Sequence, residues 1–261
     1  STSPYVNWTF GNHGGGLPKG LGLIMYGPPK HGKTLITNCF AAGAHEADKD
    51  CFVIKFNTEM RGKYQKSAFL GVDQDRFIEF DSNDPVEIFN RWNEKIVPML
   101  EAGMKVGLAI FDSLNGIRGI KGLDADDVSQ HLIGDKALTV GTGFEMILSS
   151  LRKYEIPYII NCHVRANINT GPMAKYEPKE KMAAPLAIKH MGEFFMSVQR
   201  AASKDDKVDS AGNAFVDNTH KDARGDGDKT GHKIYIRMEE KTLGDHGRAG
   251  QFTVDFKKGL V

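Results

Sequence analysis

Eight consecutive residues carry the pattern of a phosphate-binding loop. They are Gly27-Pro28-Pro29-Lys30-His31-Gly32-Lys33-Thr34, and they fit the spacing G-x-x-x-x-G-K-S/T in full. Glycines let the backbone approach phosphate oxygens, and successive N–H groups at a helix N-terminus supply positive potential. Lys33 would reach the β- and γ-phosphates, and Thr34 would offer its hydroxyl to Mg²⁺. A chance glycine turn is the alternative, but an apolar run precedes this segment and a helical pattern follows it.

The motif therefore predicts a site for ATP and Mg²⁺. All eight residues of the loop are expected to contact the nucleotide. We also place Thr37, three residues beyond the loop, in the nucleotide site.

Acidic residues follow two further apolar runs. Residues 108–111 are apolar and end at Asp112, which would sit beside Thr34 and hold Mg²⁺, often through water. The alternative for Asp112 is a cap on the next turn. Glu59 follows the run 51–56 and would lie near the γ-phosphate, where it would act as the general base that activates water. A solvated loop residue is an equally good interpretation of Glu59 from its spacing.

A histidine follows a third apolar run. His163 comes directly after residues 157–162 and begins a long polar stretch. A polar side chain there would touch the γ-phosphate and pass its presence to the following loop, although a lone histidine is more often a plain polar residue. Glu59, Lys33 and His163 are therefore the candidate catalytic residues.

The elements that must position these residues alternate along the chain. Residues 21–26, 51–56, 77–80, 106–111 and 157–162 read as strands, and 33–45, 61–70, 84–101 and 127–154 read as helices, the last with a break at 141–143. Strands that are apolar on both faces favour a parallel sheet covered on both sides. Residues 194–200, 233–238 and 251–256 alternate more and predict antiparallel edge strands. The expected fold is α/β, with a mainly parallel twisted sheet.

Composition limits the function classes. The 261 residues carry a net charge of +1, so any nucleic-acid contact must come from a local basic patch. The cysteines, Cys39, Cys51 and Cys162, show no metal-ligand spacing and are expected to be core residues in a reducing compartment. No run is long enough for a membrane span and no signal peptide is evident, which predicts a cytoplasmic protein.

Two divisions of the chain follow from its glycine and charge content. Residues 1–20 are glycine-rich and are expected to form a loop that leads into a core at 21–261. Residues 164–190 and 203–232 are long and polar. We expect the first to be functional, because long loops in compact domains usually are, and the second to connect two edge strands.

Together these residues resemble the RecA-type recombinases. The similar segments are Gly16-Leu17-Pro18, the loop 27–34, Glu59, Leu70-Gly71-Val72, Phe111-Asp112-Ser113, Ile160-Asn161-Cys162-His163, Glu240-Lys241-Thr242 and residues 252–259. The phage UvsX branch looks closest, because a histidine ends the fifth strand there, where bacterial RecA has glutamine. The resemblance covers roughly residues 14–261.

The resemblance implies two DNA-binding loops, at about 114–135 and 164–187. The candidate DNA contacts in them are Arg118, Lys121, Arg165, Met173, Lys175, Tyr176, Lys179 and Lys181. Residues 165–190 hold five Lys or Arg against two Glu, a net of +3, which suits phosphate contacts without base readout. Met173 and Tyr176 would wedge between bases or stack on them. A solvated loop is the alternative for any single lysine.

The resemblance also implies that ATP lies between adjacent subunits. Lys241 matches a basic position that acts across that interface, but its usual basic companion is Glu239 here. Lys66 stands where the family has an adenine-stacking tyrosine, and Tyr64 nearby is the substitute candidate. The family's N-terminal helix and polymerisation strand are largely missing, so residues 1–20 are expected to be a truncated or short oligomerisation region. Weak self-assembly follows.

The function expected from motifs and resemblance is an ATP-dependent, DNA-stimulated recombination protein that hydrolyses ATP to ADP and phosphate. Its expected partners are single-stranded DNA, homologous duplex DNA, further copies of itself in a helical filament, and single-stranded-DNA-binding and mediator proteins. It would act in a bacterial cytoplasm, as a phage or bacterial protein. A hexameric helicase motor and an ATP-switched regulator without motor activity are the alternatives.

Overall fold

The structure is a computed structural model, and it describes residues 3–11, 15–60, 70–120, 134–167, 180–200, 207–208, 231–241, 247–255 and 259–260. Several of the predicted site residues lie outside these ranges: Tyr64, Lys121, Met173, Lys175, Tyr176 and Lys179. The expected helix at 61–70 lies almost entirely outside them too, as does the start of the expected helix at 127–154.

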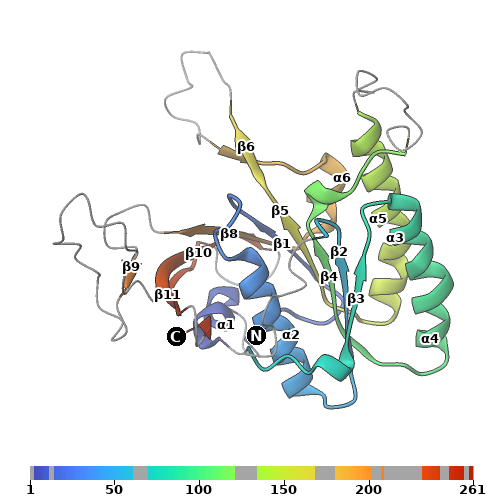
Figure 1. The fold of residues 1–261 in the computed structure, drawn as a ribbon, viewed down its shortest axis with the longest axis horizontal. Coiled ribbons are helices and arrows are strands. Elements are labelled where there is room, and N and C mark those ends of the chain that lie inside the picture. The colour runs from blue at the N-terminus through green and yellow to red at the C-terminus, as the bar shows by residue number, and fades with distance from the viewer. Residues whose placement is uncertain are drawn as a thin grey trace.

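A large mixed sheet forms the centre of the molecule (Figure 1). The strands on its main path are β1 (Gly22–Tyr26), β2 (Phe52–Asn57), β3 (Phe77–Asp81), β4 (Val106–Asp112), β5 (Tyr158–Cys162), β8 (Phe194–Arg200), β10 (Gly231–Lys241), β11 (Ala249–Asp255) and β12 (Gly259–Leu260). Their spatial order is β12-β11-β10-β8-β1-β5-β4-β2-β3, and β9 (Lys207–Val208) pairs with β10. The pairs from β3 to β8 are parallel, and those from β8 to β12 are antiparallel. The predicted fold class is confirmed.

Alternate residues of the central strands enter two separate cores. Ile24, Ala109 and Phe111 point into one hydrophobic cluster, whereas Leu23 and Ile110 point into the other. Successive side chains of a strand face opposite sides, so both faces of the sheet must be apolar and covered. This is why the apolar runs predicted the central strands correctly.

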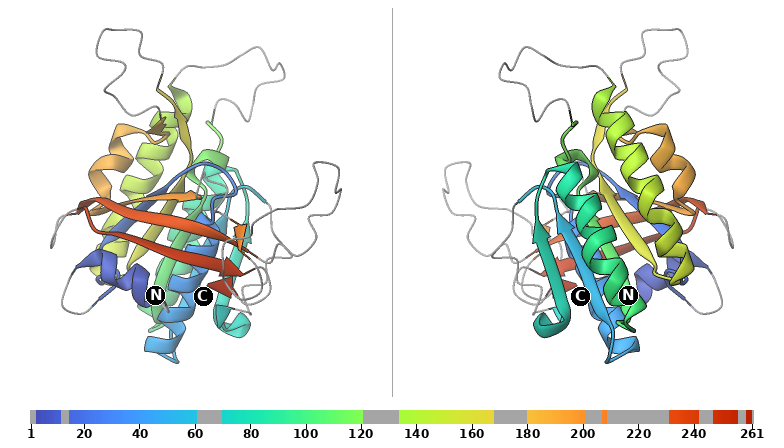
Figure 2. Two further views of the ribbon diagram at one scale, coloured as in Figure 1. Left: turned by 90° about the vertical axis from the view of Figure 1, so that its left-hand side faces the viewer. Right: turned by 90° about the vertical axis from the view of Figure 1, so that its right-hand side faces the viewer.

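Helices cover both faces of the sheet (Figure 2). The first core lies under α3 (Pro85–Arg91), η3 (Trp92–Ile96), α4 (Val97–Glu101) and α5 (Asp135–Lys153), and the second under α1 (Pro4–Phe10) and α2 (Lys33–Ala47). Asp84 caps α3, because its Oδ1 accepts hydrogen bonds from the amides of Val86 and Glu87 at 2.8 and 3.4 Å. Among the helices of the described residues, none is long and apolar enough to cross a membrane.

Two expectations for helices were wrong. Helix α5 continues through Gly141 and Gly143 without the predicted break. A Cβ on Gly143 would lie 2.0 Å from the ring of Phe89, so this glycine allows α5 to pack closely on α3. Residues 4–10 also form a helix, α1, where a loop was expected.

Helix α1 belongs to the core of this chain. Ser3 caps it, and the side chains of Val6 and Phe10 are fully buried against the sheet. Arg248, directly before β11, lies 5.1 Å from the ring centroid of Trp8 and donates a hydrogen bond to the Trp8 carbonyl. The Ser-Pro start and apolar residues four apart are helix signals that the glycine content obscured.

The prediction that β8 is an antiparallel edge strand was also wrong. β8 pairs with β1 in parallel and with β10 antiparallel, so the sheet changes direction on one side of it. Its alternation arose because Phe194, Met196 and Val198 are buried while their neighbours are partly covered. Alternation reports how the two faces are covered and says nothing of strand direction.

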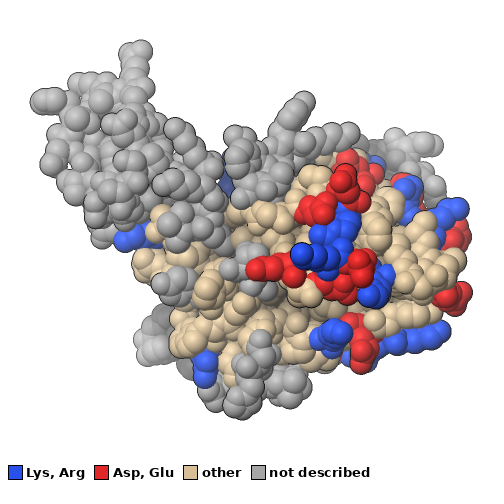
Figure 3. Space-filling model, turned by 90° about the horizontal axis from the view of Figure 1, so that it is seen from below, with Lys and Arg blue, Asp and Glu red and all other residues tan. Residues whose placement is uncertain are grey.

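A short hairpin occupies part of the polar stretch 164–190. It pairs β6 (Val164–Ala166) with β7 (Glu180–Met182), and α6 (Leu186–Met191) follows. In Figure 1 this hairpin stands at the carboxyl ends of the central strands. The opposite end of the molecule, seen from below in Figure 3, shows acidic and basic residues intermixed. Lys105, directly before β4, lies 3.8 Å from Asp48 and 3.7 Å from Asp50.

Candidate nucleotide site at the carboxyl ends of the central strands

The glycine-rich loop 27–34 joins β1 to α2 and packs tightly against the antiparallel part of the sheet. A Cβ on Gly27 would lie 2.1 Å from the carbonyl oxygen of Val198, and one on Gly32 would lie 2.2 Å from Ile234. Gly32 also has a φ of 94°, in the left-handed region that favours glycine. The loop therefore holds its backbone in a shape that larger residues would disturb.

A histidine fastens the middle of the loop to β8. The Nδ1 atom of His31 accepts a hydrogen bond from the Arg200 amide at 3.0 Å, which requires that nitrogen to be unprotonated. Burial lowers the pKa of His31, and the nearby cations Lys33 and Arg200 lower it further. Pro29 and Lys30, in contrast, are exposed at the tip of the loop.

Lys33 folds back over the loop that precedes it. Its Nζ donates to the carbonyls of Gly27 at 2.7 Å and Pro28 at 2.9 Å, and its side chain is buried. Burial lowers the pKa of Lys33, and the carboxylates of Asp112 and Glu59 oppose this. The ammonium group thus lies at the mouth of the loop, with two acidic groups near enough to affect it.

Thr34 and Asp112 meet as the sequence predicted. The Thr34 hydroxyl donates to Oδ2 of Asp112 at 2.9 Å, and Asn161 Nδ2 donates to Oδ1 at 3.0 Å. The same amide donates to Thr37 Oγ1 at 3.1 Å, and this hydroxyl lies 3.0 Å from the carbonyl of Lys33. Asp112 is therefore held at both oxygens by neighbours from α2 and β5.

Thr37 lies one turn into α2, beneath the loop. Its side chain is fully buried and its hydroxyl lies within hydrogen-bond distance of Asn161 and the Lys33 carbonyl. One helical turn below the loop, it faces the sheet and not the surface. Its contacts support the side chains that the nucleotide would meet.

Glu59 and His163 also come together. Nε2 of His163 lies 2.7 Å from Oε1 of Glu59, and the hydroxyl of Ser113 donates to the same oxygen at 2.6 Å. Both side chains are about one-quarter exposed, at 25% for His163 and 26% for Glu59. The pair thus borders the surface and is partly shielded from water.

The donor set fits Mg²⁺ with ATP. Magnesium takes oxygen ligands and is usually bound by one or two carboxylates together with substrate phosphates and water. Thr34, in the first turn of α2, and Asp112, the last residue of β4, supply such oxygens. Within the ranges that the structure describes, no three His, Cys, Asp or Glu side chains gather into a metal cluster. Binding shared with phosphates needs no such cluster.

The described DNA-contact candidates lie near this edge. Arg118 is exposed shortly after η4 (Leu114–Gly116), and Arg165 and Lys181 occupy paired, exposed positions in the β6–β7 hairpin. These positions put two cations side by side. Lys189 of α6, exposed as well, adds a third charge to the same stretch of chain.

Two predictions concern the end of β10. Lys241 is its last residue, and the Lys241 side chain lies outside what the structure describes. Glu239 Oε1 accepts a hydrogen bond from Ser197 Oγ at 3.0 Å. Burial raises the pKa of Tyr26, directly before the loop, to about 12, and the charges of Glu239 and Glu240 contribute. Arg237, whose Nε lies 3.6 Å from Oε2 of Glu239, opposes this rise.

The sequence reasoning gave no role to Asn161, Ser113 or Asn115. Asn161 is a fully buried amide in an otherwise apolar strand, and that contrast was a usable signal. Ser113 and Asn115 follow Asp112 in a tight turn, and nothing in their spacing indicates their partners. Cys162, one residue further than Asn161, stays a core thiol, because burial raises its pKa to about 12.

RecA proteins are among the known proteins that this chain resembles. The chain is 25% identical to the RecA protein of Campylobacter jejuni over 246 residues, which is 94% of this chain and 63% of the relative. It is 25% identical to RecA of Streptomyces avermitilis and 24% identical to RecA of Streptomyces coelicolor, each over 199 residues, 76% of this chain and 50% of the relative. No family model matches the chain.

These similarities support a RecA-like family. The chain spans between half and about two-thirds of the length of these curated relatives.

Proposed function

We propose that the protein is an ATP-dependent, DNA-stimulated recombination protein of the UvsX-like kind that promotes strand exchange between single-stranded DNA and homologous duplex. The observation that carries the proposal is that two side-chain pairs, Thr34 with Asp112 and Glu59 with His163, lie at the carboxyl ends of the central strands. Lys33 lies beside them. A phosphate loop, a metal-ligand pair and an acid with an ordering partner are the parts that ATP hydrolysis requires. The similarity to RecA proteins over most of the chain agrees with it.

The loop would bind the triphosphate. Backbone amides of the loop and the first turn of α2 donate to phosphate oxygens, and Lys33 exchanges its two carbonyl partners for the β- and γ-phosphates. Thr34 and Asp112 would hold Mg²⁺, which would supply positive charge to the phosphate oxygens. Asn161 keeps Asp112 in position, since it occupies the second carboxylate oxygen.

Glu59 would act as the general base. It accepts the proton of a water molecule as the water oxygen bonds to the γ-phosphorus and the bond to the bridging oxygen of ADP breaks. Ser113 and His163 both bind Oε1 of Glu59, so they fix the orientation of the carboxylate. His163 would then register whether the γ-phosphate is present.

DNA binding is proposed for the basic residues beyond the sheet edge. Arg118, Arg165 and Lys181 are exposed there, and the sequence places Lys121, Lys175 and Lys179 in the same two segments. Their charges would neutralise phosphates without reading bases. Met173 and Tyr176 would contact the bases themselves.

We also propose self-association into a filament, with single-stranded-DNA-binding and mediator proteins as partners. ATP would lie between subunits, with Lys241 of one copy reaching the nucleotide of the next and Tyr64 near the adenine. The exposed edge of β3, which pairs only with β2 within the described sheet, offers a place for a neighbouring chain. Helix α1 packs on the sheet of its own chain, so it would not be the segment that pairs with β3 of a neighbouring copy.

The test is steady-state ATP hydrolysis with Mg²⁺, with and without single-stranded DNA. Wild type is expected to be stimulated by DNA, and Lys33→Ala is expected to lose hydrolysis in both conditions. Lys95→Ala is the matched control, because Lys95 is exposed on the helical layer away from the loop. Hydrolysis that ignores DNA would contradict the proposal and favour a regulator. Strand unwinding by closed rings would favour a helicase motor.

A further inference from the structure

We propose that Asn115 is a positioning residue that carries the state of the nucleotide site to the β6–β7 hairpin and to α5. The inference deepens the proposed function and rests on it only in requiring that ATP binds at residues 27–34. Asn115 lies in η4, three residues after Asp112, and is partly buried. It is not expected to touch ATP or the metal.

Asn115 closes a ring of contacts with the candidate catalytic pair. Its Oδ1 accepts the His163 amide at 2.6 Å, and the His163 ring lies 2.7 Å from Glu59. Glu59 accepts from the Ser113 hydroxyl at 2.6 Å, and Ser113 is two residues before Asn115. The ring therefore runs from Glu59 through Ser113 and Asn115 to His163 and back. A shift of Glu59 toward a bound γ-phosphate must disturb Ser113, His163 or both.

The turn that carries Asn115 cannot absorb such a shift easily. The Gly116 amide donates to the Ser113 carbonyl at 3.0 Å, and the Thr58 hydroxyl donates to the same carbonyl. A Cβ on Gly116 would lie 2.4 Å from Thr58 Oγ1, so η4 packs directly on the segment that carries Glu59. Movement beside Glu59 is thus expected to move η4 as a unit.

Two contacts lead outward from Asn115. The Nδ2 of Asn115 donates to the carbonyl of Ala183, the residue directly after β7, at 3.3 Å. The backbone carbonyl of Asn115 accepts a hydrogen bond at 2.6 Å from Nζ of Lys136, which lies in the first turn of α5. The ends of both proposed DNA-binding segments therefore meet at one residue. A direct bond from the Ala183 amide to the His163 carbonyl, at 2.8 Å, accompanies the first contact.

The chemistry of an amide suits this role. Asparagine offers an acceptor and two donors from one rigid plane, so a single side chain can bind the His163 amide and the Ala183 carbonyl together. Aspartate at this position would keep the acceptor but lose the donor. Alanine would lose both contacts while leaving the Lys136 bond to the backbone carbonyl possible.

Hydrogen–deuterium exchange with Mg²⁺ and ATPγS tests the role without DNA. In wild type the nucleotide is expected to slow exchange at residues 27–34, at 117–120 and at 180–186. In Asn115→Ala the change at 27–34 persists, and the change at 180–186 falls at least about fivefold, the lower range of measured site-to-site coupling. Asn90→Ala, an exposed asparagine on α3, should behave as wild type.

Asn115→Asp keeps the inference testable if the alanine variant does not fold. This variant is expected to lose the response at 180–186 and to keep the response at 117–120. The bond between Ala183 and His163 remains in both variants, so any loss reports the Asn115 side chain. A full response at 180–186 in a folded variant, or no response there in wild type, would overturn the inference.

A second measurement separates this inference from the proposed function. ATPγS is expected to tighten single-stranded DNA binding in wild type, and that ratio of affinities should fall in Asn115→Ala by at least about fivefold. By linkage, the effect of DNA on ATPγS affinity must fall by the same factor. If wild type binds no DNA, the proposed function fails, and the exchange experiment still decides the role of Asn115.

Discussion

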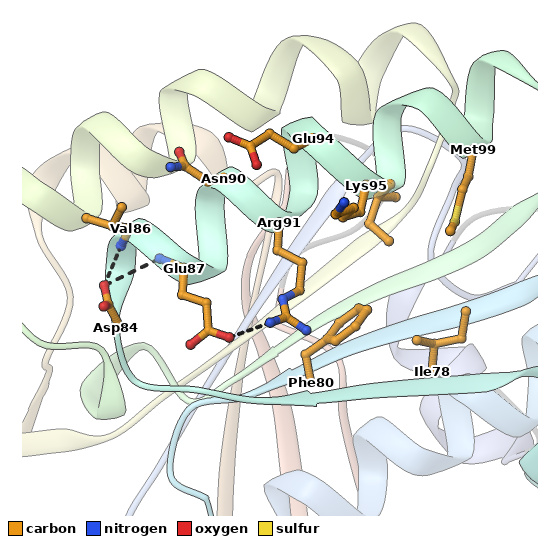
Figure 4. Close-up of a pocket in the computed structure, with 11 residues that line it drawn as sticks. Ile78, Phe80, Asp84, Val86, Glu87, Asn90, Arg91, Glu94, Lys95 and Met99 are labelled. Atoms are coloured by element: carbon orange, nitrogen blue, oxygen red, sulfur yellow. Dashed lines mark hydrogen bonds and ion pairs between the residues drawn. The ribbon is translucent and has the colours of Figure 1, made fainter.

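Two regions of the molecule each hold an acid beside a basic side chain, but in different surroundings. One is the candidate nucleotide site at the carboxyl ends of the central strands, called here the nucleotide edge, and the other is a groove between β3 and α3. In the groove, Glu87 and Arg91 form an ion pair one turn apart on α3, and Arg91 lies 4.8 Å from the ring centroid of Phe80 (Figure 4). Their side chains are 45% and 38% exposed. At the nucleotide edge, Glu59 and His163 are 26% and 25% exposed and come from segments 104 residues apart.

The groove offers space for a ligand, whereas the nucleotide site offers polar groups that could take part in a reaction. The groove is a hollow of about 590 Å³ lined by Ile78, Phe80, Ile96, Met99 and the charged face of α3. Its ion pair, Glu87 with Arg91, joins two residues of the same helix, α3. At the nucleotide edge, the ends of β1, β2, β4 and β5 bring polar groups from four segments to one place. Convergence of such groups is the better indicator of a reactive site.

The largest expected effect sharpens this contrast between the two acids. Glu59→Gln should lower ATP turnover by about 10²- to 10⁴-fold, because the amide cannot accept a proton. Nucleotide binding should be little changed, since Lys33 and the loop stay intact. Glu87→Gln in the groove is the control and should turn over ATP at the wild-type rate. Steady-state hydrolysis and fluorescent-nucleotide binding measure both; full turnover in Glu59→Gln would exclude it as the base.

A smaller effect is expected from the asparagines of the two regions. Asn161→Ala should destabilise the fold by about 1–3 kcal/mol, because it leaves buried oxygens of Asp112 and Thr37 without their donor. Asn90→Ala, exposed at the groove, should change stability by less than about 0.5 kcal/mol. Urea unfolding of both variants gives the comparison. Equal losses would mean that the amide of Asn161 is not a structural support.

The third prediction concerns pH. Burial lowers the pKa of His45, whose Nδ1 accepts the Asp73 amide at 3.1 Å before β3 begins. The His45 imidazole therefore binds a proton more readily in the unfolded chain than in the folded one. The free energy of unfolding should fall as the pH drops from 7 through the ordinary histidine pKa near 6.5.

His45→Gln should flatten that slope, since no proton can then bind. His190→Gln, exposed on α6, should keep it. Unfolding midpoints between pH 5 and 8 are the measurement. A slope that is unchanged in His45→Gln would assign the pH dependence to other groups, such as His31.

The smallest expected effect is the ion pair of the groove. A double-mutant cycle with Glu87→Gln and Arg91→Met should give a coupling of about 0.3–0.5 kcal/mol, because both groups are well exposed. Salt should weaken it further. A coupling energy several times larger would contradict the view that the ion pair of the groove is a weak, solvent-exposed contact.

Much of the site could be read from residue types alone. The phosphate loop has a fixed spacing, and Asp112, Glu59 and His163 each follow a segment that the sequence predicts to be a strand. In parallel sheets such positions share one edge, so their proximity was predictable. The loop residues, Thr34–Asp112 and Glu59–His163 lie accordingly. The burial of Thr37 was not predictable, because a residue one turn into a helix can face either the surface or the sheet.

The packing decided the rest. Whether Gly141 and Gly143 end a helix or let it approach Phe89 depends on a neighbour 54 residues away from Gly143 in the chain. The direction of β8 depends on its partners, since alternation is the same in parallel and antiparallel pairs. Helix α1 is stabilised by burial of Val6 and Phe10 on the sheet.

By itself, the sequence determined the loop and the central strands, because local spacing specifies the loop and apolar segments specify the strands. From these it predicted a phosphate site and the acids beside it. Only the tertiary structure decided which amides support those groups. Asn115 and Asn161 find partners across 68 and 124 residues of chain, at Ala183 and Thr37. Such contacts depend on how distant segments pack together, and no local pattern encodes them.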